Sequence, residues 1–168
     1  MPALAHLGIG FATKRFAPQI PLWALLISSM VLDILSFIFI SALWITHGLF
    51  MSVIWSIVAF LITALITIRL KTKKEQDNNS ALWSKEIINI SIVIGLLVFS
   101  HWVLDFIGWP MSVIDPNATG VPLLFDYAAT IGLGVYSTWL GALIMDIGVF
   151  FVGLAVYLHY VKKVRKVK

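Results

Sequence analysis

The chain alternates long apolar runs with short polar interruptions, and the lengths of the runs predict helices that cross a membrane. A helix needs about 20 mostly apolar residues to span the hydrocarbon core of a bilayer. Four runs meet this requirement with few internal charges. They cover approximately residues 21–45, 49–68, 86–107 and 136–160. The pattern predicts an all-α integral membrane protein with four transmembrane helices.

The N-terminal segment is also apolar but is too short to be a span. It covers residues 1–16 and ends at the basic pair Lys14-Arg15. Pro18 and Pro21 then interrupt the chain, and proline breaks a helix or starts a new one. We expect a short N-terminal half-helix that lies at half depth or in the membrane interface.

The polar interruptions divide the chain into two sets of loops. Residues 69–85 form the one long hydrophilic loop, and residues 46–48 and 108–122 are turn-rich. Residues 123–134 are apolar but interrupted by glycine, so an interfacial and a re-entrant segment are both compatible with them. A basic tail covers residues 161–168.

The basic residues indicate the orientation of the spans. All twelve lysines and arginines lie at 14–15, in the loop 69–85 or in the tail. Alternation of four spans places these three clusters on one side, which the positive-inside rule identifies as cytoplasmic. The C-terminus is therefore predicted to be cytoplasmic. Because the clusters are explained by topology, they do not indicate a nucleic-acid partner.

Composition narrows the class further. Of the 168 residues, 60% are hydrophobic and 12% charged, and the mean hydropathy is +0.97, which is too apolar for a soluble domain of this size. We expect a single transmembrane domain over residues 1–168. The absence of cysteine excludes disulfides and thiolate metal sites.

The spans carry few polar residues, and most of these reach a common depth. At 1.5 Å per residue, Asp33, His47, His101, Asp105 and Asp146 lie between about 22 and 33 Å above the cytoplasmic boundary. Ionisable groups inside a membrane are costly and usually have partners. His101 and Asp105 are four residues apart and share one helix face.

One further histidine fits this depth less well. His6 reaches only about 12 Å above Lys14 on an upright first helix.

Three imidazoles and two or three carboxylates at one level favour a divalent metal, above all zinc, for which these are the usual ligands without cysteine. A cation also offsets the repulsion between Asp33 and Asp105 in an apolar pocket. The same residues also suit a proton relay or an ion path, or a purely structural polar cluster.

Four fragments carry a resemblance to a known family: Ala5-His6-Leu7-Gly8-Ile9-Gly10-Phe11-Ala12-Thr13-Lys14-Arg15, Val31-Leu32-Asp33, Thr46-His47-Gly48 and Ser100-His101-Trp102-Val103-Leu104-Asp105-Phe106. They resemble a family of small bacterial and archaeal membrane proteins described as membrane-bound metal-dependent hydrolases. The order His, Asp, His and HxxxD is also similar to the metal framework of zinc phospholipase C. The resemblance implies a prokaryotic cell-membrane protein with one or two zinc ions. It implies the ligands His6, Asp33, His47, His101 and Asp105, with Asp105 as the bridge.

The leading hypothesis is a membrane-embedded hydrolase of a phosphoester or another ester, with membrane lipid as a candidate substrate. In it, Asp33, Asp105 and Asp146 are the candidate catalytic carboxylates, and Asp33 or Asp146 is the candidate general base. Two alternatives stay open. One is a small transporter or ion path, which with four spans requires a homo-oligomer. The other is a non-catalytic membrane subunit, suggested because Ile107-Gly108-Trp109-Pro110 lacks the histidine that relatives carry after this aspartate.

Overall fold

The computed structural model describes residues 3–38, 43–74, 84–113, 116–124 and 129–167, and within them the chain is almost entirely helical. The α-helices are α1 (Ala3–Phe16), α2 (Leu22–Ile38), α3 (Leu43–His47), α4 (Leu49–Lys74), α5 (Lys85–Gly108), α6 (Trp139–Leu143) and α7 (Val149–Val167). A 3-10 turn, η1 (Val135–Ser137), precedes α6, and a π-helical segment, η2 (Ile144–Gly148), joins α6 to α7. The predicted all-α class is confirmed.

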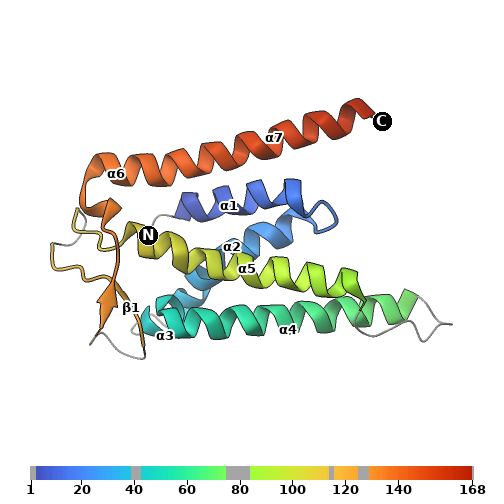
Figure 1. The fold of residues 1–168 in the computed structure, drawn as a ribbon, viewed down its shortest axis with the longest axis horizontal. Coiled ribbons are helices and arrows are strands. Elements are labelled where there is room, and N and C mark those ends of the chain that lie inside the picture. The colour runs from blue at the N-terminus through green and yellow to red at the C-terminus, as the bar shows by residue number, and fades with distance from the viewer. Residues whose placement is uncertain (1–2, 39–42, 75–83, 114–115, 125–128, 168) are drawn as a thin grey trace.

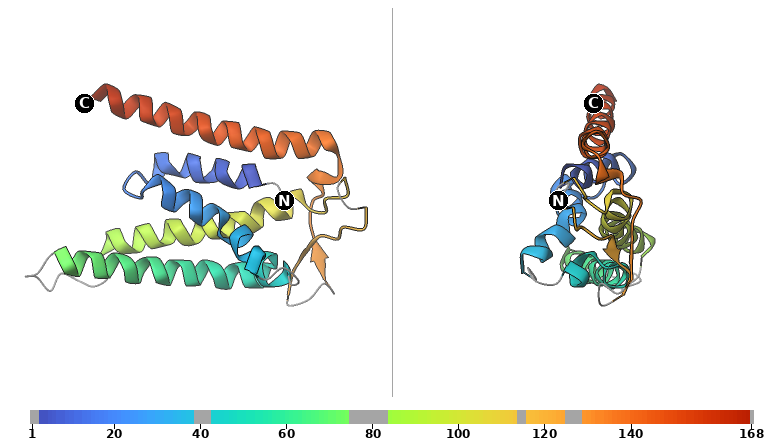
Figure 2. Two further views of the ribbon diagram at one scale, coloured as in Figure 1. Left: turned by 180° about the vertical axis from the view of Figure 1, so that it is seen from behind. Right: turned by 90° about the vertical axis from the view of Figure 1, so that its left-hand side faces the viewer.

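The helices lie in a stack with α5 near its centre. Figure 1 shows α7 on one side, then α1, then α2 crossing beside α5, and α4 on the far side. The end view in Figure 2 shows that α7 stands out from the rest of the bundle, and its main helical neighbour is α1. The apolar window of α5 is 44% buried, whereas that of α4 is 11% and that of α6–α7 is 6% buried. A side chain on α5 is therefore the best placed to meet partners from several helices.

Within the described part of the chain, three helical stretches are long and apolar enough to cross a membrane: residues 49–71, 85–108 and 139–166. They correspond to the last three predicted spans. The predicted first span, 21–45, contains the shorter apolar helix α2, with 17 residues or about 25 Å, and then α3; residues 39–42 between them lie outside the described part. The half-helix predicted at the N-terminus is α1.

The polar segments differ from prediction in two places. Helix α4 continues to Lys74, so the start of the predicted loop at 69–85 is helical, because Lys, Arg and Thr do not end a helix by themselves; residues 75–83 lie outside the described part. Within the predicted turn at 46–48, only Gly48 bends, since Thr46 and His47 belong to α3.

The segment after α5, predicted as a turn-rich loop followed by an interfacial or re-entrant stretch, holds a small hairpin. Strand β1 (Val121–Pro122) pairs antiparallel with β2 (Thr130–Ile131), in the register Val121↔Ile131. The backbone continues this contact, because Leu133 N–H donates to Phe106 O and Phe50 N–H donates to Leu123 O. The hairpin thus connects the end of α5 to the start of α4.

Helices α1 and α7 approach each other closely at glycine. A Cβ built on Gly153 of α7 would lie 1.9 Å from the backbone oxygen of Gly8 in α1, and one built on Gly8 would lie 2.5 Å from Val149 O. Small residues at such positions let two helix backbones come into contact, a common device between apolar helices. These glycines fix α1 between α7 and the α2–α5 layer.

This contact predicts the effect of a larger side chain. Gly153→Val places atoms where the backbone of α1 already lies, and we expect it to destabilise the fold by about 1–3 kcal/mol. Thermal unfolding of the purified protein measures the loss. Gly148→Ala, in η2 directly before α7, is the control, since the nearest atom to its new Cβ is 4.0 Å away. Equal unfolding temperatures for the two variants would contradict the proposed contact.

Candidate metal centre

The five residues proposed as metal ligands come together in one buried cluster, hereafter the His/Asp cluster. It consists of His6 from α1, Asp33 from α2, His47 from α3, and His101 with Asp105 from α5. Each residue is between 0% and 5% exposed. Four separate helices therefore turn their polar side chains toward one point beside the central helix.

The distances between the polar atoms of the cluster are nearly uniform. The Nε2 atom of His47 lies 3.5 Å from Asp33 Oδ1 and 3.7 Å from Asp105 Oδ2. The Nε2 atom of His101 lies 3.5 Å and 3.6 Å from the same two oxygens. Two imidazole nitrogens and two carboxylate oxygens thus alternate around a common centre.

These atoms are close together, yet they do not satisfy one another by hydrogen bonding. The Nε2 atoms of His47 and His101, both oxygens of Asp33, and Asp105 Oδ2 are buried and have no hydrogen-bond partner among the described residues. A buried polar atom without a partner costs about 1–3 kcal/mol, and more if it is charged. A cluster of such atoms in one place calls for a group that interacts with all of them.

The spacing suits a tetrahedral metal ion. Zinc binds imidazole nitrogen and carboxylate oxygen at about 2.0–2.2 Å, so two ligands at the tetrahedral angle lie about 3.4 Å apart. The four N···O distances of 3.5 to 3.7 Å agree with this separation. The rings of His47 and His101 are inclined at 66°, so an ion between them can lie in the plane of both rings.

His6 occupies a different position in the same cluster. Its ring is stacked on that of His101, with centroids 3.6 Å apart and an angle of 2° between the planes. An ion in the plane of one ring would lie well outside the plane of the other, so two stacked imidazoles are poorly placed to share one ion. The Nε2 atom of His6 instead lies 3.6 Å from Asp105 Oδ1, whereas His47 and His101 lie near Oδ2 of the same carboxylate.

A backbone carbonyl and a hydroxyl group orient two of the histidines through contacts with their Nδ1 atoms. His101 Nδ1 lies 2.9 Å from the carbonyl oxygen of Ser29, which can only accept, so Nδ1 carries the proton and Nε2 is free to bind a metal. His47 Nδ1 lies 2.7 Å from the hydroxyl of Thr46. Metal-binding histidines usually have such a contact at the second ring nitrogen.

Asp146, proposed as a catalytic carboxylate, is not part of the His/Asp cluster. Among the described residues, two groups have potential ligand atoms within 4.8 Å of one another: His6, Asp33 and His101, and His47, His101 and Asp105. Asp146 belongs to neither. Its Oδ1 atom accepts a hydrogen bond of 2.8 Å from the backbone N–H of Ala5, at the start of α1.

Tyr136 lies near both regions and was not anticipated. Its ring packs against Gly108, one turn beyond Asp105, and its buried hydroxyl has no hydrogen-bond partner among the described residues. Burial and the negative charges of Asp146 and Asp105 raise the pKa of Tyr136, so the hydroxyl is protonated at neutral pH. In the sequence, a tyrosine next to a serine in a glycine-interrupted segment gives no signal of this placement.

Comparisons with protein-family models, with curated proteins and with solved structures give no match for this chain. The resemblance to membrane-bound metal-dependent hydrolases therefore rests on the sequence fragments that carry it. The geometry of the His/Asp cluster is compatible with that resemblance.

The contact between Thr46 and His47 gives a test of the cluster as a metal centre. Thr46→Val keeps the shape of the side chain but removes the hydroxyl, so His47 Nδ1 loses its partner. Loss of such a supporting contact weakens metal binding by about 10- to 100-fold, which a zinc titration of the purified protein measures. Thr46→Ser keeps the hydroxyl and is expected to bind like the wild type. A valine variant with unchanged affinity would contradict this role.

Proposed function

We propose that this protein is a membrane-embedded, metal-dependent hydrolase that acts on a phosphoester or carboxylic ester at the bilayer. The observation that supports it most is the set of four N···O distances around one centre, made by buried atoms without hydrogen bonds. The ligand set proposed is Asp33, His47, His101 and Asp105. We also propose that the protein lies in a cell membrane, because its surface is largely apolar.

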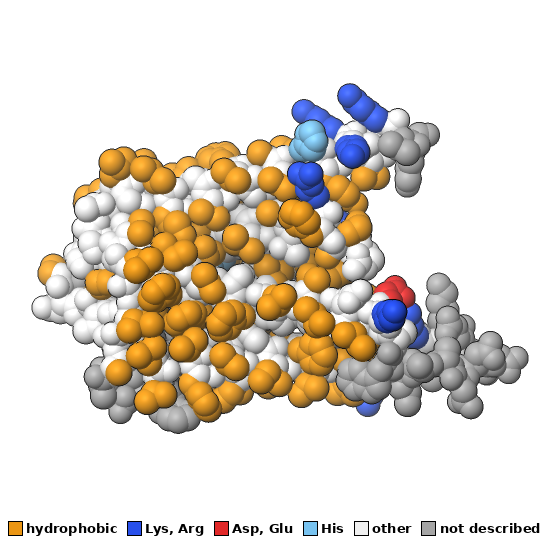
Figure 3. All heavy atoms as spheres, viewed as in Figure 1, with side chains coloured by type: hydrophobic (Ala, Val, Ile, Leu, Met, Phe, Trp, Pro, Cys, Tyr) orange, Lys and Arg blue, Asp and Glu red, His pale blue; other side chains and the backbone are white. Residues whose placement is uncertain are grey.

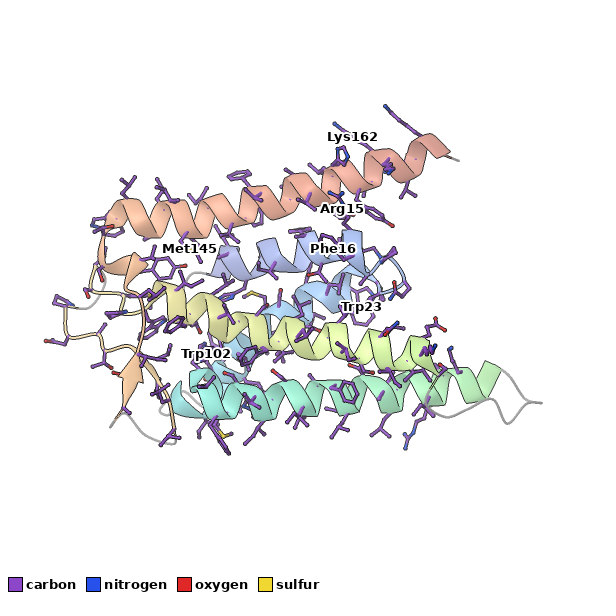
Figure 4. The ribbon with its side chains drawn as sticks, viewed as in Figure 1. Arg15, Phe16, Trp23, Trp102, Met145 and Lys162 are labelled. Carbon is purple, nitrogen blue, oxygen red and sulfur yellow. The ribbon has the colours of Figure 1, made fainter. Side chains whose placement is uncertain are left out.

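The surface supports insertion in a bilayer. Figure 3 shows apolar side chains over the body of the bundle and lysines and arginines gathered toward one end. Arg15 and Lys162 belong to that end, where α1 and α7 run toward the same side (Figure 4). We propose that the basic end is cytoplasmic, that α4, α5 and α6–α7 span the membrane, and that α2 with α3 completes a fourth crossing.

The charge of the cluster favours a divalent cation. With Asp33 and Asp105 ionised and the histidines neutral, the cluster carries two negative charges in an apolar interior. An unpaired buried charge is strongly unfavourable. One dication neutralises both carboxylates. Imidazole nitrogen and carboxylate oxygen are ligands that zinc accepts, and a single ion would satisfy all four of these atoms. Hydrolysis also needs a position for water, which zinc would provide by expanding from four to five ligands.

The side chains also have the chemistry that hydrolysis requires. A bound zinc ion supplies a Lewis acid that polarises an ester oxygen and lowers the pKa of water toward 7. Hydrolysis adds water across the ester bond and releases an acid and an alcohol. Asp33 Oδ2, which is buried and without a hydrogen-bond partner, is the candidate acceptor of the proton from water. His6 Nε2 lies 3.6 Å from Oδ1 of Asp105, the second carboxylate of the cluster.

Metal analysis tests the centre directly. We expect about one zinc ion per chain in the purified protein, and His101→Ala is expected to lose it, because this imidazole contributes a ligand and the stacking surface for His6. At a free zinc concentration of 100 times the Kd, the wild type gains about 2.7 kcal/mol of stability. His159→Ala is the matched control, since His159 is exposed on α7. Wild-type protein without zinc, and without a thermal shift on its addition, would overturn the metal centre.

A hydrolysis assay tests the reaction. The wild type is reconstituted in phospholipid vesicles and supplied with chromogenic phosphodiester and carboxylic ester probes. We expect the wild type to release the chromophore, and we expect this release to stop when zinc is chelated and to return when zinc is added. His101→Ala is expected to abolish the release, and His159→Ala is expected to leave it unchanged.

Zinc binding without turnover of either probe or of the vesicle lipid would contradict the hydrolase. Proton flux across the same vesicles that Asp33→Asn abolishes would then favour the ion path.

A further inference from the structure

Helix α1 begins at Ala3 and carries His6 in its first turn. The first N–H groups of a helix have no partner within the helix and are usually satisfied by a side-chain oxygen just before it. The residues that precede α1 are Met1 and Pro2, and neither offers a side-chain oxygen. The start of this helix therefore needs a partner from elsewhere in the chain.

Asp146 supplies that partner from the other end of the sequence. Its Oδ1 atom accepts from Ala5 N–H at 2.8 Å, across a separation of 141 residues. A carboxylate at this end of a helix also interacts favourably with the helix dipole. Ala5 is fully buried and directly precedes His6, so this hydrogen bond holds the turn from which the imidazole projects.

The local structure around Asp146 directs its carboxylate to α1. Asp146 lies in the π-helical segment η2, which sits between α6 and α7 and itself contacts α1. Its neighbour Met145 is labelled in Figure 4. Met145 lines an apolar cavity of about 590 Å³ together with Gly8 of α1 and Gly153 of α7. The close glycine contact lies next to the hydrogen bond, so η2 and α7 support the first two turns of α1 at two adjacent points.

We infer that Asp146 is a positioning residue that holds the first turn of α1, so that His6 stacks on His101 and faces Asp105 Oδ1. The inference rests on the proposed function for its chemical consequence, but the placement of His6 is measurable without metal. It assigns to Asp146 a role as an acceptor for the backbone of α1, distinct from that of a general base.

The first experiment measures where His6 lies. Diethyl pyrocarbonate modifies accessible imidazoles, and mass spectrometry of the full-length protein in detergent reports His6 and His159 separately. In the wild type we expect His6 to be protected and the exposed His159 to react. In Asp146→Ala we expect the His6 rate to rise about fivefold or more, the factor that the loss of one N-terminal cap implies.

Two variants separate the hydrogen bond from other effects. Asp146→Asn keeps an oxygen that accepts from Ala5 N–H, and we expect it to protect His6 as the wild type does. Thr138→Ala removes a comparable cap at the start of α6, where the Thr138 hydroxyl accepts from Gly141 N–H. Because this cap belongs to α6 and not to α1, we expect no change in the reactivity of His6. Unchanged His6 reactivity in Asp146→Ala, or no rescue by asparagine, would overturn the inference.

The second experiment links the position of His6 to the metal. Zinc affinity is measured for His6→Ala, Asp146→Ala and the double variant. If Asp146 acts through His6, each single change weakens binding by about tenfold or more and the double variant is no weaker than His6→Ala. If the losses of zinc affinity in the two single variants multiply in the double variant, Asp146 does not act through His6. Wild-type protein that binds no zinc refutes the proposed function alone, because the reactivity of His6 still decides the role of Asp146.

Discussion

The structure depends on the burial of two carboxylates and three imidazoles at one point in an apolar bundle. Asp33 and Asp105 are at most 5% exposed, and the atoms that face the centre have no hydrogen-bond partners among the described residues. Their separations of 3.5 to 3.7 Å are too long for hydrogen bonds and suit the edges of a metal coordination sphere. These separations join the Nε2 atoms of His47 and His101 to one oxygen each of Asp33 and Asp105. A group that binds all four atoms would offset the free energy lost when they are buried without hydrogen bonds.

The arrangement of helices follows from this requirement. Helix α5 provides two of the five side chains because it is the most buried of the long helices and its His101 and Asp105 share a face. The second ring nitrogens of His101 and His47 are held by Ser29 O and by the hydroxyl of Thr46, which leaves the Nε2 atoms directed to the centre. The site is thus built on rigid helices and oriented by their own neighbouring groups.

Helix α1 is the element whose position depends most on distant parts of the chain. Glycine contacts with α7 and the hydrogen bond from Ala5 to Asp146 place it, and it in turn carries His6. The depth estimate made His6 the least suitable residue, because it took the basic pair of α1 to lie level with the basic residues of the other helices. Figure 1 shows that α1 ends short of α4 and α7 on that side, so His6 reaches the cluster from a helix of only 14 residues.

The sequence pattern was sufficient for the helical class, the approximate extent of the long apolar helices and four of the clustered residues, Asp33, His47, His101 and Asp105; the family resemblance added His6, and the depth estimate wrongly included Asp146. Apolar runs of span length have few alternatives to a helix, and a charged group within them is conspicuous. Only the tertiary structure decided that α4 continues into the basic segment, that Val121 pairs with Ile131, and that Asp146 contacts the backbone of Ala5. It also placed the ring of His6 in a stack on that of His101. These outcomes depend on distances between elements remote in the chain and on the orientation of ring planes, which residue types and spacing do not encode.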